Sequence, residues 1–188
     1  MYKEPMLIDL TLRITPKMVA DAQGNEKRAL VGHLGTHFDV MNKVFPLEYT
    51  QRNGIVFHVP AADRDVGLED VDLDAVEPGM FVAFHTGFIE REPYGSPSYF
   101  HAHPQLSREL IDALLERQVS IIGIDCAGIR RGKEHPIIDQ ICADRGVFVV
   151  ENLCNLGAIE GTCIVNTYPM NYEGVTGLPC RVVAEVFK

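Results

Sequence analysis

The stretch Val31-Gly-His-Leu-Gly-Thr-His-Phe-Asp-Val40 places three side chains that bind metals well, His33, His37 and Asp39, close together in the chain. In an extended segment alternate side chains point to the same side, so these three would share one face, and Gly35 would leave space between the imidazoles. In a helix, Asp39 would point away from His37, and Gly35-Thr36 would lower helix propensity. The stretch therefore predicts an extended segment that forms the floor of a metal site.

Two neutral imidazoles and one carboxylate suit a borderline divalent ion and leave coordination positions open for water. Open positions distinguish a catalytic metal site from a structural one. The alternative is that these three residues are ordinary polar residues of a strand or a turn. We expect Zn²⁺ or, failing that, Mn²⁺ as the cofactor, with one or two ions bound.

Composition and charge narrow the class of protein. The 188 residues are 46% hydrophobic and 23% charged, as in globular chains, and we expect one domain over residues 1–188. The net charge of −9 argues against a nucleic-acid surface, and no apolar run is long enough to span a bilayer. Five cysteines without a close pair favour reduced thiols. We expect a cytoplasmic protein with a small-molecule substrate and no nucleic-acid or membrane partner.

Periodicity and turn residues predict an α/β domain with a mixed sheet or small barrel-like β layer and helices outside it. The alternation of strands and helices in the second half predicts parallel strands joined by crossovers. Ser107 is a good N-cap for the first of the two helices. The segment 90–104 is rich in proline, glycine, serine and tyrosine and predicts a long loop of the kind that covers active sites. Strands are predicted over 6–12, 55–59, 80–85, 119–125 and 147–151, and helices over 108–118 and 135–145.

The run His33-Leu-Gly-Thr-His37-Phe-Asp39 resembles the signature of the cyclase family of metal-dependent hydrolases, which includes bacterial kynurenine formamidases and isatin hydrolase. That signature reads His-x-Gly-Thr-His-x-Asp-x-Pro-x-His. Shorter similarities follow along the chain, among them Ile8-Asp-Leu-Thr11, Phe84-His-Thr-Gly87, Ile121-Ile-Gly-Ile-Asp125 and the closing strand Gly177-Leu-Pro-Cys-Arg-Val-Val183. The resemblance implies a swivelling β/β/α fold and a homodimer or homotetramer.

The resemblance also implies that His135 and Glu151 complete the metal centre, with Asp39 as the bridge if two ions bind. Taken alone, His135 would be a helix residue facing water, and Glu151 would be a salt-bridged residue at a strand end. Because the side chains at the carboxyl ends of parallel strands project into a crevice, the position of Glu151 itself favours a functional role.

Two positions depart from the family signature: Met41 replaces its proline and Lys43 its last histidine. As an ammonium beside a single ion, Lys43 could stabilise an oxyanion or act as an acid. Alternatively Lys43 points to solvent, His101 or His103 supplies the proton, and a second ion still binds. A third interpretation is that the replacement of the histidine by Lys43 has abolished the hydrolytic activity of the protein. We predict Lys43, Glu151 and His103 as the catalytic residues.

A bound divalent ion with an open position lowers the pKa of its water and polarises a carbonyl. Together with the resemblance, this predicts an arylformamidase-like amide hydrolase acting on N-formylkynurenine or a related aryl formamide or lactam. The side chains predicted to contact the substrate are Tyr94, Tyr99, Phe100 and His101 of the long loop. The alternatives are a cyclase or dehydratase, in which the ion stabilises an enolate, and a catalytically impaired family member.

Overall fold

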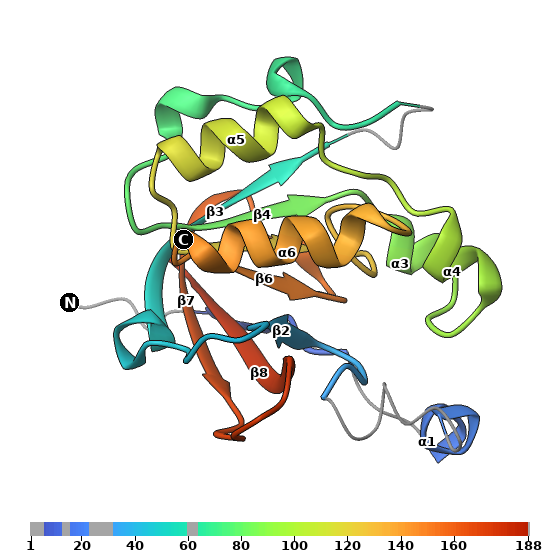
Figure 1. The fold of residues 1–188 in the computed structure, drawn as a ribbon. Helices are drawn as coiled ribbons and strands as arrows, with labels where there is room; N and C mark the ends of the chain where they lie inside the picture. The colour runs from blue at the N-terminus through green and yellow to red at the C-terminus, as the bar shows by residue number, and fades with distance from the viewer. Residues whose placement is uncertain (1–5, 13–15, 23–31, 60–63, 188) are drawn as a thin grey trace.

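The computed structural model describes residues 6–12, 16–22, 32–59 and 64–187. Its centre is one sheet of eight strands in the order β1-β8-β2-β6-β5-β4-β3-β7. Because β7 also pairs with β8, seven of these strands close into a barrel, which Figure 1 shows beneath the outer helices. The strands are β1 (Met6–Asp9), β2 (His37–Asp39), β3 (Gln51–His58), β4 (Phe81–His85), β5 (Ile121–Ile124), β6 (Phe148–Glu151), β7 (Gly161–Pro169) and β8 (Gly177–Val186). This confirms the predicted class, an α/β fold with a mixed, barrel-like β layer.

The sheet is mixed because its halves are built differently. Strands β3, β4, β5 and β6 are parallel neighbours, as the alternation of strands and helices predicts. The remaining pairings are antiparallel. Strand β8 is long enough to pair with β2 at one end, with β1 at the other and with β7 along its length. Its length therefore closes the barrel.

Helices α5 (Arg108–Glu116) and α6 (Glu134–Asp144) cover one side of the barrel, and the short helices α3 (Phe88–Arg91) and α4 (Pro97–His101) lie at one end of it (Figure 1). Ser107 caps α5 as predicted, because its side chain accepts a hydrogen bond from the Leu110 amide at 3.1 Å. The two short helices α3 and α4 lie at the end toward which β4 and β6 point. The helices are α1 (Pro16–Ala22), α3 (Phe88–Arg91), α4 (Pro97–His101), α5 (Arg108–Glu116) and α6 (Glu134–Asp144).

Side-chain alternation along the strands divides the apolar residues into two cores. One fills the barrel and contains Phe38, Ala83 and Val150. The other lies between the barrel and helices α5 and α6 and contains Phe84 and Val149. Residues that alternate with Phe38 and Val150 therefore face the helices, and these include both ends of β2 and the last residue of β6.

The elements differ from the sequence expectations in several places. The predicted loop 90–104 contains helix α4, because Ser96 caps it by accepting a hydrogen bond from the Tyr99 amide and Pro97 occupies its first turn. The first strand ends at Asp9, three residues earlier than expected. Strand β7 is not predicted, although Thr162, Ile164 and Val165 favour strands. Among the described residues, no helix has the length and hydropathy needed to cross a membrane.

The ends of β3 and β4 meet in a pair of histidines that face the barrel interior. His58 and His85 occupy matching positions of the two strands, and their Nδ1 atoms lie 2.9 Å apart. The His58 Nε2 atom contacts the Ile159 carbonyl oxygen at 2.8 Å, and the His85 Nε2 atom contacts Glu90 Oε1 at 3.1 Å. The pair thus ties two parallel strands to the segments that follow β6 and β4.

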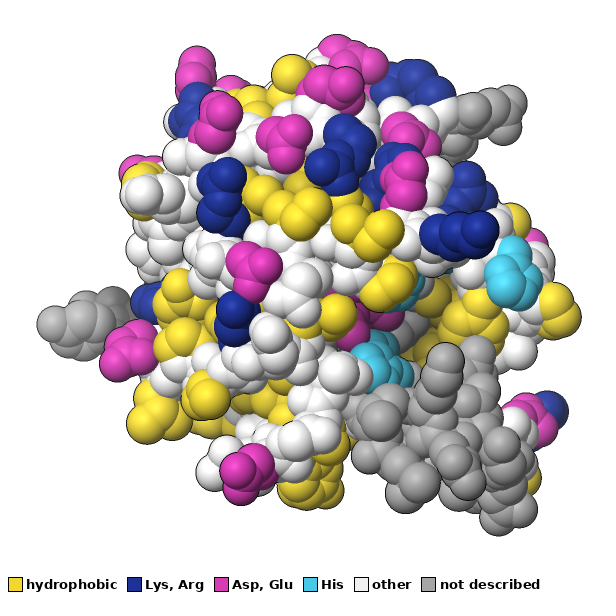
Figure 2. All heavy atoms as spheres, in the orientation of Figure 1, with side chains coloured by type: hydrophobic (Ala, Val, Ile, Leu, Met, Phe, Trp, Pro, Cys, Tyr) yellow, Lys and Arg dark blue, Asp and Glu magenta, His cyan; other side chains and the backbone are white. Residues whose placement is uncertain are grey.

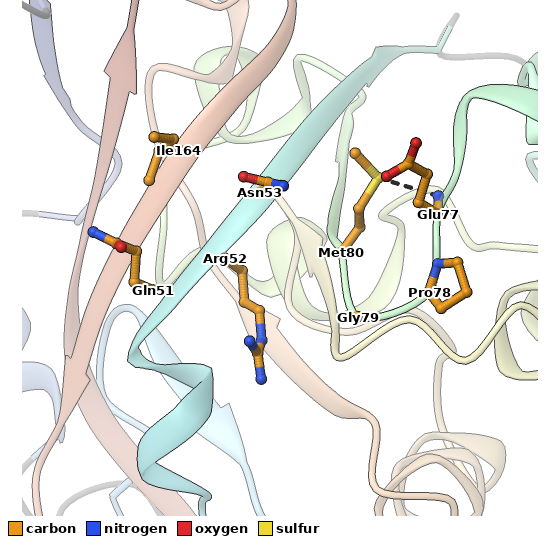
Figure 3. A pocket seen from close by; sticks show the side chains of 8 residues that line it. All are labelled: Gln51, Arg52, Asn53, Glu77, Pro78, Gly79, Met80 and Ile164. Carbon is orange, nitrogen blue, oxygen red and sulfur yellow. Dashed lines mark hydrogen bonds between the residues drawn. The ribbon is translucent and has the colours of Figure 1, made fainter.

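A pocket of about 280 Å³ lies at the opposite ends of these strands, where β3 and β4 begin (Figure 3). Its walls carry Arg52 and Glu77 as the charged side chains, together with Gln51, Asn53 and Met80. Arg52 stacks over the ring of Tyr49 at 4.5 Å. Because histidines and cysteines do not line it, this pocket lacks the side chains from which metal sites are usually built.

Candidate metal centre

The residues before β2 form a turn and not the extended segment that alternation predicts. Only His37–Asp39 are in a strand, and Gly35 has a φ of 74°, a left-handed conformation that glycine adopts readily. This turn folds His33 back toward the strand. The prediction of a continuous extended segment is therefore wrong, yet the three side chains still converge.

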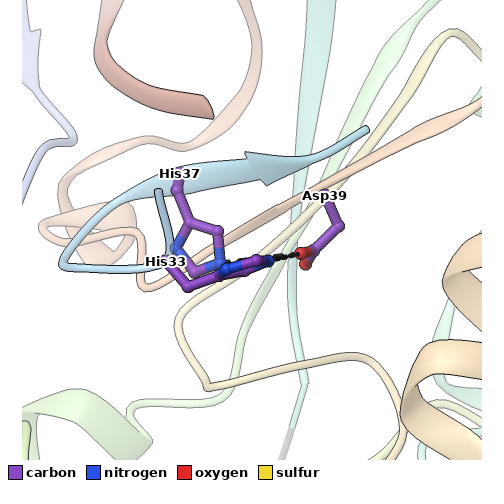
Figure 4. Close-up of side chains that lie close together, drawn as sticks. All are labelled: His33, His37 and Asp39. Atoms are coloured by element: carbon purple, nitrogen blue, oxygen red, sulfur yellow. Dashed lines mark ion pairs between the residues drawn. The ribbon is translucent and has the colours of Figure 1, made fainter. Parts of the chain in front are cut away.

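His33, His37 and Asp39 point toward a common space (Figure 4). The Nε2 atom of His33 lies 3.0 Å from Asp39 Oδ1, and the Nε2 atom of His37 lies 3.7 Å from the same oxygen. Two ligand atoms that are each about 2.0–2.2 Å from one ion lie about 3–4 Å apart. The spacing is therefore that of ligands around a single divalent cation.

A second group of ligand atoms adjoins the first and shares Asp39 with it. His135, from the first turn of α6, lies 3.1 Å from Asp139 Oδ2 and 3.1 Å from Glu151 Oε1. The other oxygen of Glu151 lies 3.5 Å from His37 Nε2. The structure thus brings all five predicted metal ligands together and adds Asp139, which the sequence reasoning missed.

Asp139 could have been found from the sequence. His135 and Asp139 are four residues apart in a predicted helix, and residues at that spacing lie on the same face. Once His135 is taken as a ligand, the carboxylate one turn further along the helix is a natural companion.

The hydrogen bonding of these side chains fits a bound cation. A carbonyl oxygen can only accept, so His37 Nδ1 donates to the Gly35 carbonyl at 2.8 Å, and Nε2 is left as a lone pair. Among the described residues, His37 Nε2, Asp39 Oδ2 and Asp139 Oδ1 are buried acceptors without a hydrogen-bond donor. Such unpaired buried groups are costly, and a divalent ion would satisfy all three.

Burial and neighbouring charges shift the pKa values of the side chains in this cluster. Burial lowers the pKa of His37, so its ring is neutral, as a ligand must be. Burial raises the pKa of Asp39, but His37 and His33 beside it lower that pKa more, and the net change is downward. Burial and the neighbouring charge of Asp39 hold the pKa of Glu151 well above its usual range. Three buried carboxylates in one place therefore need a compensating positive charge.

The Gly35 peptide is held from three sides, which fixes the turn on which His37 sits. Its N–H donates to the Tyr94 hydroxyl at 3.0 Å, and its carbonyl also accepts from Asn152 Nδ2 at 2.9 Å. The Tyr99 hydroxyl donates to Asn152 Oδ1 at 2.7 Å. Asn152 directly follows Glu151, so one short segment supplies a cluster carboxylate and the support for a cluster histidine. Asn152 was missed because the sequence shows nothing of this contact.

Lys43 does not belong to the cluster, and its predicted catalytic role is corrected here. Its Nζ atom pairs with Asp144 Oδ1 at 2.6 Å, and its side chain is 37% exposed. Asp144 ends α6, whereas His135 lies in the first turn of that helix, about 13 Å away at 1.5 Å per residue. This placement is the alternative in which Lys43 points away from the metal.

His103 is brought close to the cluster, but its chemistry differs from the prediction of a proton donor. Its Nδ1 atom donates to the Pro104 carbonyl oxygen at 2.8 Å, and Nε2 has no hydrogen-bond partner among the described residues. Burial, together with the charges of Arg131 and His135, lowers the pKa of His103 to about 4. At neutral pH the ring can therefore accept a proton but not supply one.

The four predicted substrate contacts separate into two kinds. Tyr99 is fully buried and cannot touch a substrate, because its hydroxyl is used by Asn152. Tyr94 is half-buried with its hydroxyl on Gly35, Phe100 is half-buried, and His101 is exposed. The prediction for Tyr99 is therefore wrong, and the role of the other three in substrate binding stays a prediction.

The cluster lies at the end of the barrel where α6 begins. Figure 2 shows a hollow on this face in which acidic and histidine side chains are visible, bordered by hydrophobic ones. A ligand could thus approach buried carboxylates from solvent past an apolar rim.

A closed mixed barrel with outer helices and a cluster of three histidines and three buried carboxylates defines the class: an α/β protein with a candidate centre for divalent metal. The model of the Cyclase family matches residues 8–130, which is more than half of the chain, and the protein therefore belongs to that family. Among curated protein sequences, none is significantly similar to it.

Solved structures share the fold over almost the whole chain. A protein described as a potential metal-dependent hydrolase with cyclase activity is 21% identical, with a TM-score of 0.77 over 97% of this chain and 98% of its own. Isatin hydrolase A from Ralstonia solanacearum is 17% identical, with a TM-score of 0.73 over 97% and 92%. Isatin hydrolase A from Labrenzia aggregata is 18% identical, with a TM-score of 0.73 over 97% and 94%. At these identities the similarity establishes the common fold.

Proposed function

We propose that this protein is a metal-dependent hydrolase that adds water to the carbonyl of an aryl formamide or a cyclic aryl amide. The observation that carries the proposal is the set of buried, unpaired ligand atoms of His37, Asp39 and Asp139 in one cluster. Membership of the Cyclase family and the fold shared with isatin hydrolases support the choice of reaction. The reaction consumes one water and, with an aryl formamide, releases formate and an aryl amine.

The two ligand groups that share Asp39 support binding of two ions, one held by His33, His37 and Asp39 and one by Asp39, His135, Asp139 and Glu151. A pair of histidines with a carboxylate suits Zn²⁺, whereas a group dominated by carboxylates also suits Mn²⁺. When bound, such ions polarise a carbonyl oxygen and lower the pKa of coordinated water.

The chain's own residues would position the reactants and move protons. Glu151 is buried beside His135, and a carboxylate oxygen of it that is not bound to an ion would lie where it can relay a proton to the departing nitrogen. His103 presents a neutral, unpaired Nε2 atom that can accept a proton from water. Phe100, half-buried in α4, offers an aromatic face for the ring of the substrate.

Metal removal tests the proposal directly. The purified protein is stripped with a chelator, then titrated with Zn²⁺ or Mn²⁺ while hydrolysis of formanilide, N-formylkynurenine and isatin is followed. We expect no turnover without metal and recovery on its return, and Asp39→Asn should abolish recovery. A protein that binds metal tightly but hydrolyses none of these substrates would contradict the hydrolase proposal.

The cyclase or dehydratase alternative is separated from hydrolysis by isotopic water. Hydrolysis transfers oxygen from ¹⁸O-labelled water into the acid product, and elimination does not. Mass spectrometry of the product therefore identifies the reaction class independently of its rate.

A further inference from the structure

A pocket of about 390 Å³ adjoins the metal centre where the chain enters α6. Its walls come from the end of α4 and from the loop 130–134, and they include Phe100, His101, Gln105, Arg131, Lys133 and Glu134. Figure 2 shows Lys and Arg side chains on this face close to the hollow described above. Three basic residues within four positions are unusual in a chain whose net charge is −9.

One of these cations is already neutralised. Arg130 Nη1 lies 2.5 Å from Asp65 Oδ2, and its Nη2 atom lies 2.6 Å from Glu134 Oε2. Arg130 also donates to the Leu106 carbonyl at 2.9 Å. This arginine therefore holds the loop in place and offers little charge to a ligand.

In the part of the chain that the structure describes, the other two cations have no carboxylate partner. Arg131 is anchored by its backbone N–H, which donates to Gln105 Oε1 at 2.8 Å, and by Nη1, which donates to the His101 carbonyl at 3.0 Å. Among the described residues, no carboxylate oxygen lies within ion-pair distance of Arg131 or Lys133. Arg131 is thus a positioned guanidinium whose remaining donors are free for a carboxylate.

The pocket is fixed close to the metal ligands. Glu134 lines it and precedes His135 in the chain, so their Cα atoms are about 3.8 Å apart. The loop before α6 also packs tightly on His135, because a Cβ atom at Gly128 would lie 2.8 Å from His135 Cε1. The pocket therefore lies beside the histidine of the second ligand group, and none of the six cluster side chains lines it.

We propose that Arg131 and Lys133 select substrates that carry a carboxylate, so that the preferred substrate is an aryl amide with an anionic group on or near its ring. The inference rests on the proposed hydrolase function for the position of the scissile amide. Phe100 lines the same pocket and would contact the ring, while the two cations hold the carboxylate.

Matched substrates test this selection. Formanilide is compared with the 2-, 3- and 4-formamidobenzoates and with 4-formamidobenzamide, which has the same shape as the 4-benzoate without its charge. We expect the best benzoate to exceed the benzamide in kcat/KM by about 10-fold or more. Arg131→Gln should lower kcat/KM on that benzoate by about 10- to 100-fold and bring the ratio of benzoate to benzamide close to one. Lys133→Gln should act in the same direction, and its exposed side chain makes misfolding a minor concern.

Arg145→Gln is the matched control, because Arg145 is an exposed cation at the other end of α6. It carries the same change of charge and should leave the ratio of benzoate to benzamide unaltered. A ratio near one in the wild type, or equal losses in the Arg145 and Arg131 variants, would overturn the proposal.

Binding without turnover separates this inference from the proposed function. Benzoate, phenyl phosphate and benzamide are titrated into the metal-loaded protein and followed by nuclear magnetic resonance. Preferential binding of benzoate that Arg131→Gln abolishes supports the carboxylate site even if no amide is hydrolysed. Equal binding of benzoate and benzamide, or a preference for phenyl phosphate, rejects it while hydrolysis of formanilide can still stand.

Discussion

The Nδ2 atom of Asn152 lies 2.9 Å from the carbonyl oxygen of Gly35, the same oxygen that accepts a hydrogen bond from His37 Nδ1 at 2.8 Å. The asparagine thus supports the acceptor that sets the tautomer and the orientation of a metal-ligand histidine. Such outer contacts commonly change metal affinity by about 10- to 100-fold when they are removed.

Replacing Asn152 by glycine should therefore weaken metal binding by about 10-fold or more. Glycine is chosen because Asn152 has a φ of 58°, which alanine adopts poorly. Isothermal titration with Zn²⁺ measures the effect. Asn155→Gly is the control, because Asn155 has the same φ and donates instead to the Asp9 carbonyl. Equal metal affinities of the two variants would show that the Gly35 contact does not position His37.

Replacing Asp139 by asparagine should lower the number of bound ions or their affinity, because the buried carboxylate faces His135 at 3.1 Å and belongs to the second ligand group. Metal content after dialysis, measured by atomic emission, gives the stoichiometry. Asp144→Asn changes the same type of residue at the exposed end of the same helix and should retain all the metal. If the Asp139 variant kept the same metal content as the wild type, Asp139 would not be a metal ligand.

Lys43→Ala and Lys43→His should both leave kcat/KM within about twofold of the wild type, because Lys43 pairs with Asp144 and not with the cluster. Because water screens this exposed pair, its loss should change the free energy of unfolding little. Steady-state kinetics and urea unfolding measure the two quantities. If the alanine variant lost activity by more than about 10-fold with its metal content unchanged, Lys43 would have to be regarded as a catalytic residue.

His103 should make the protein less stable as the pH falls from about 6.5 to about 4. Burial lowers the pKa of His103 from 6.5 to about 4, so in this range the unfolded chain binds a proton that the folded chain does not. The stability contributed by the neutral ring is complete above pH 6.5, and up to about 3 kcal/mol is lost by pH 4. Urea unfolding at several pH values should show a smaller loss for His103→Gln than for the exposed control His101→Gln. Parallel curves would mean that His103 is protonated in the folded state.

The sequence predicts the ligand types well because a metal centre needs particular side chains at particular spacings. His33, His37 and Asp39 converge even though Gly35 turns the chain, since the short separation limits how far apart they can lie. Lys43 is placed by its contact with Asp144 at the far end of α6. The sequence around Lys43 does not reveal where that end of the helix lies. The composition of the loop likewise cannot show that Tyr99 is buried and Tyr94 is only partly buried. The burial of Tyr99 depends on the packing of α4 on the segment after β6.

The paired histidines at the ends of β3 and β4 have a consequence for the hydrogen atoms they carry. His58 Nε2 faces a carbonyl and His85 Nε2 faces a carboxylate, so each must bear a hydrogen, and the contact between the two Nδ1 atoms requires a third. Two neutral imidazoles supply only two hydrogens. All three contacts can therefore be hydrogen bonds at the same time only when the two rings carry three hydrogens between them, on the face of the sheet opposite the metal cluster. Nitrogen-15 spectra of these rings would show which of the four ring nitrogens carry a hydrogen, and hence which of the three contacts are hydrogen bonds in solution.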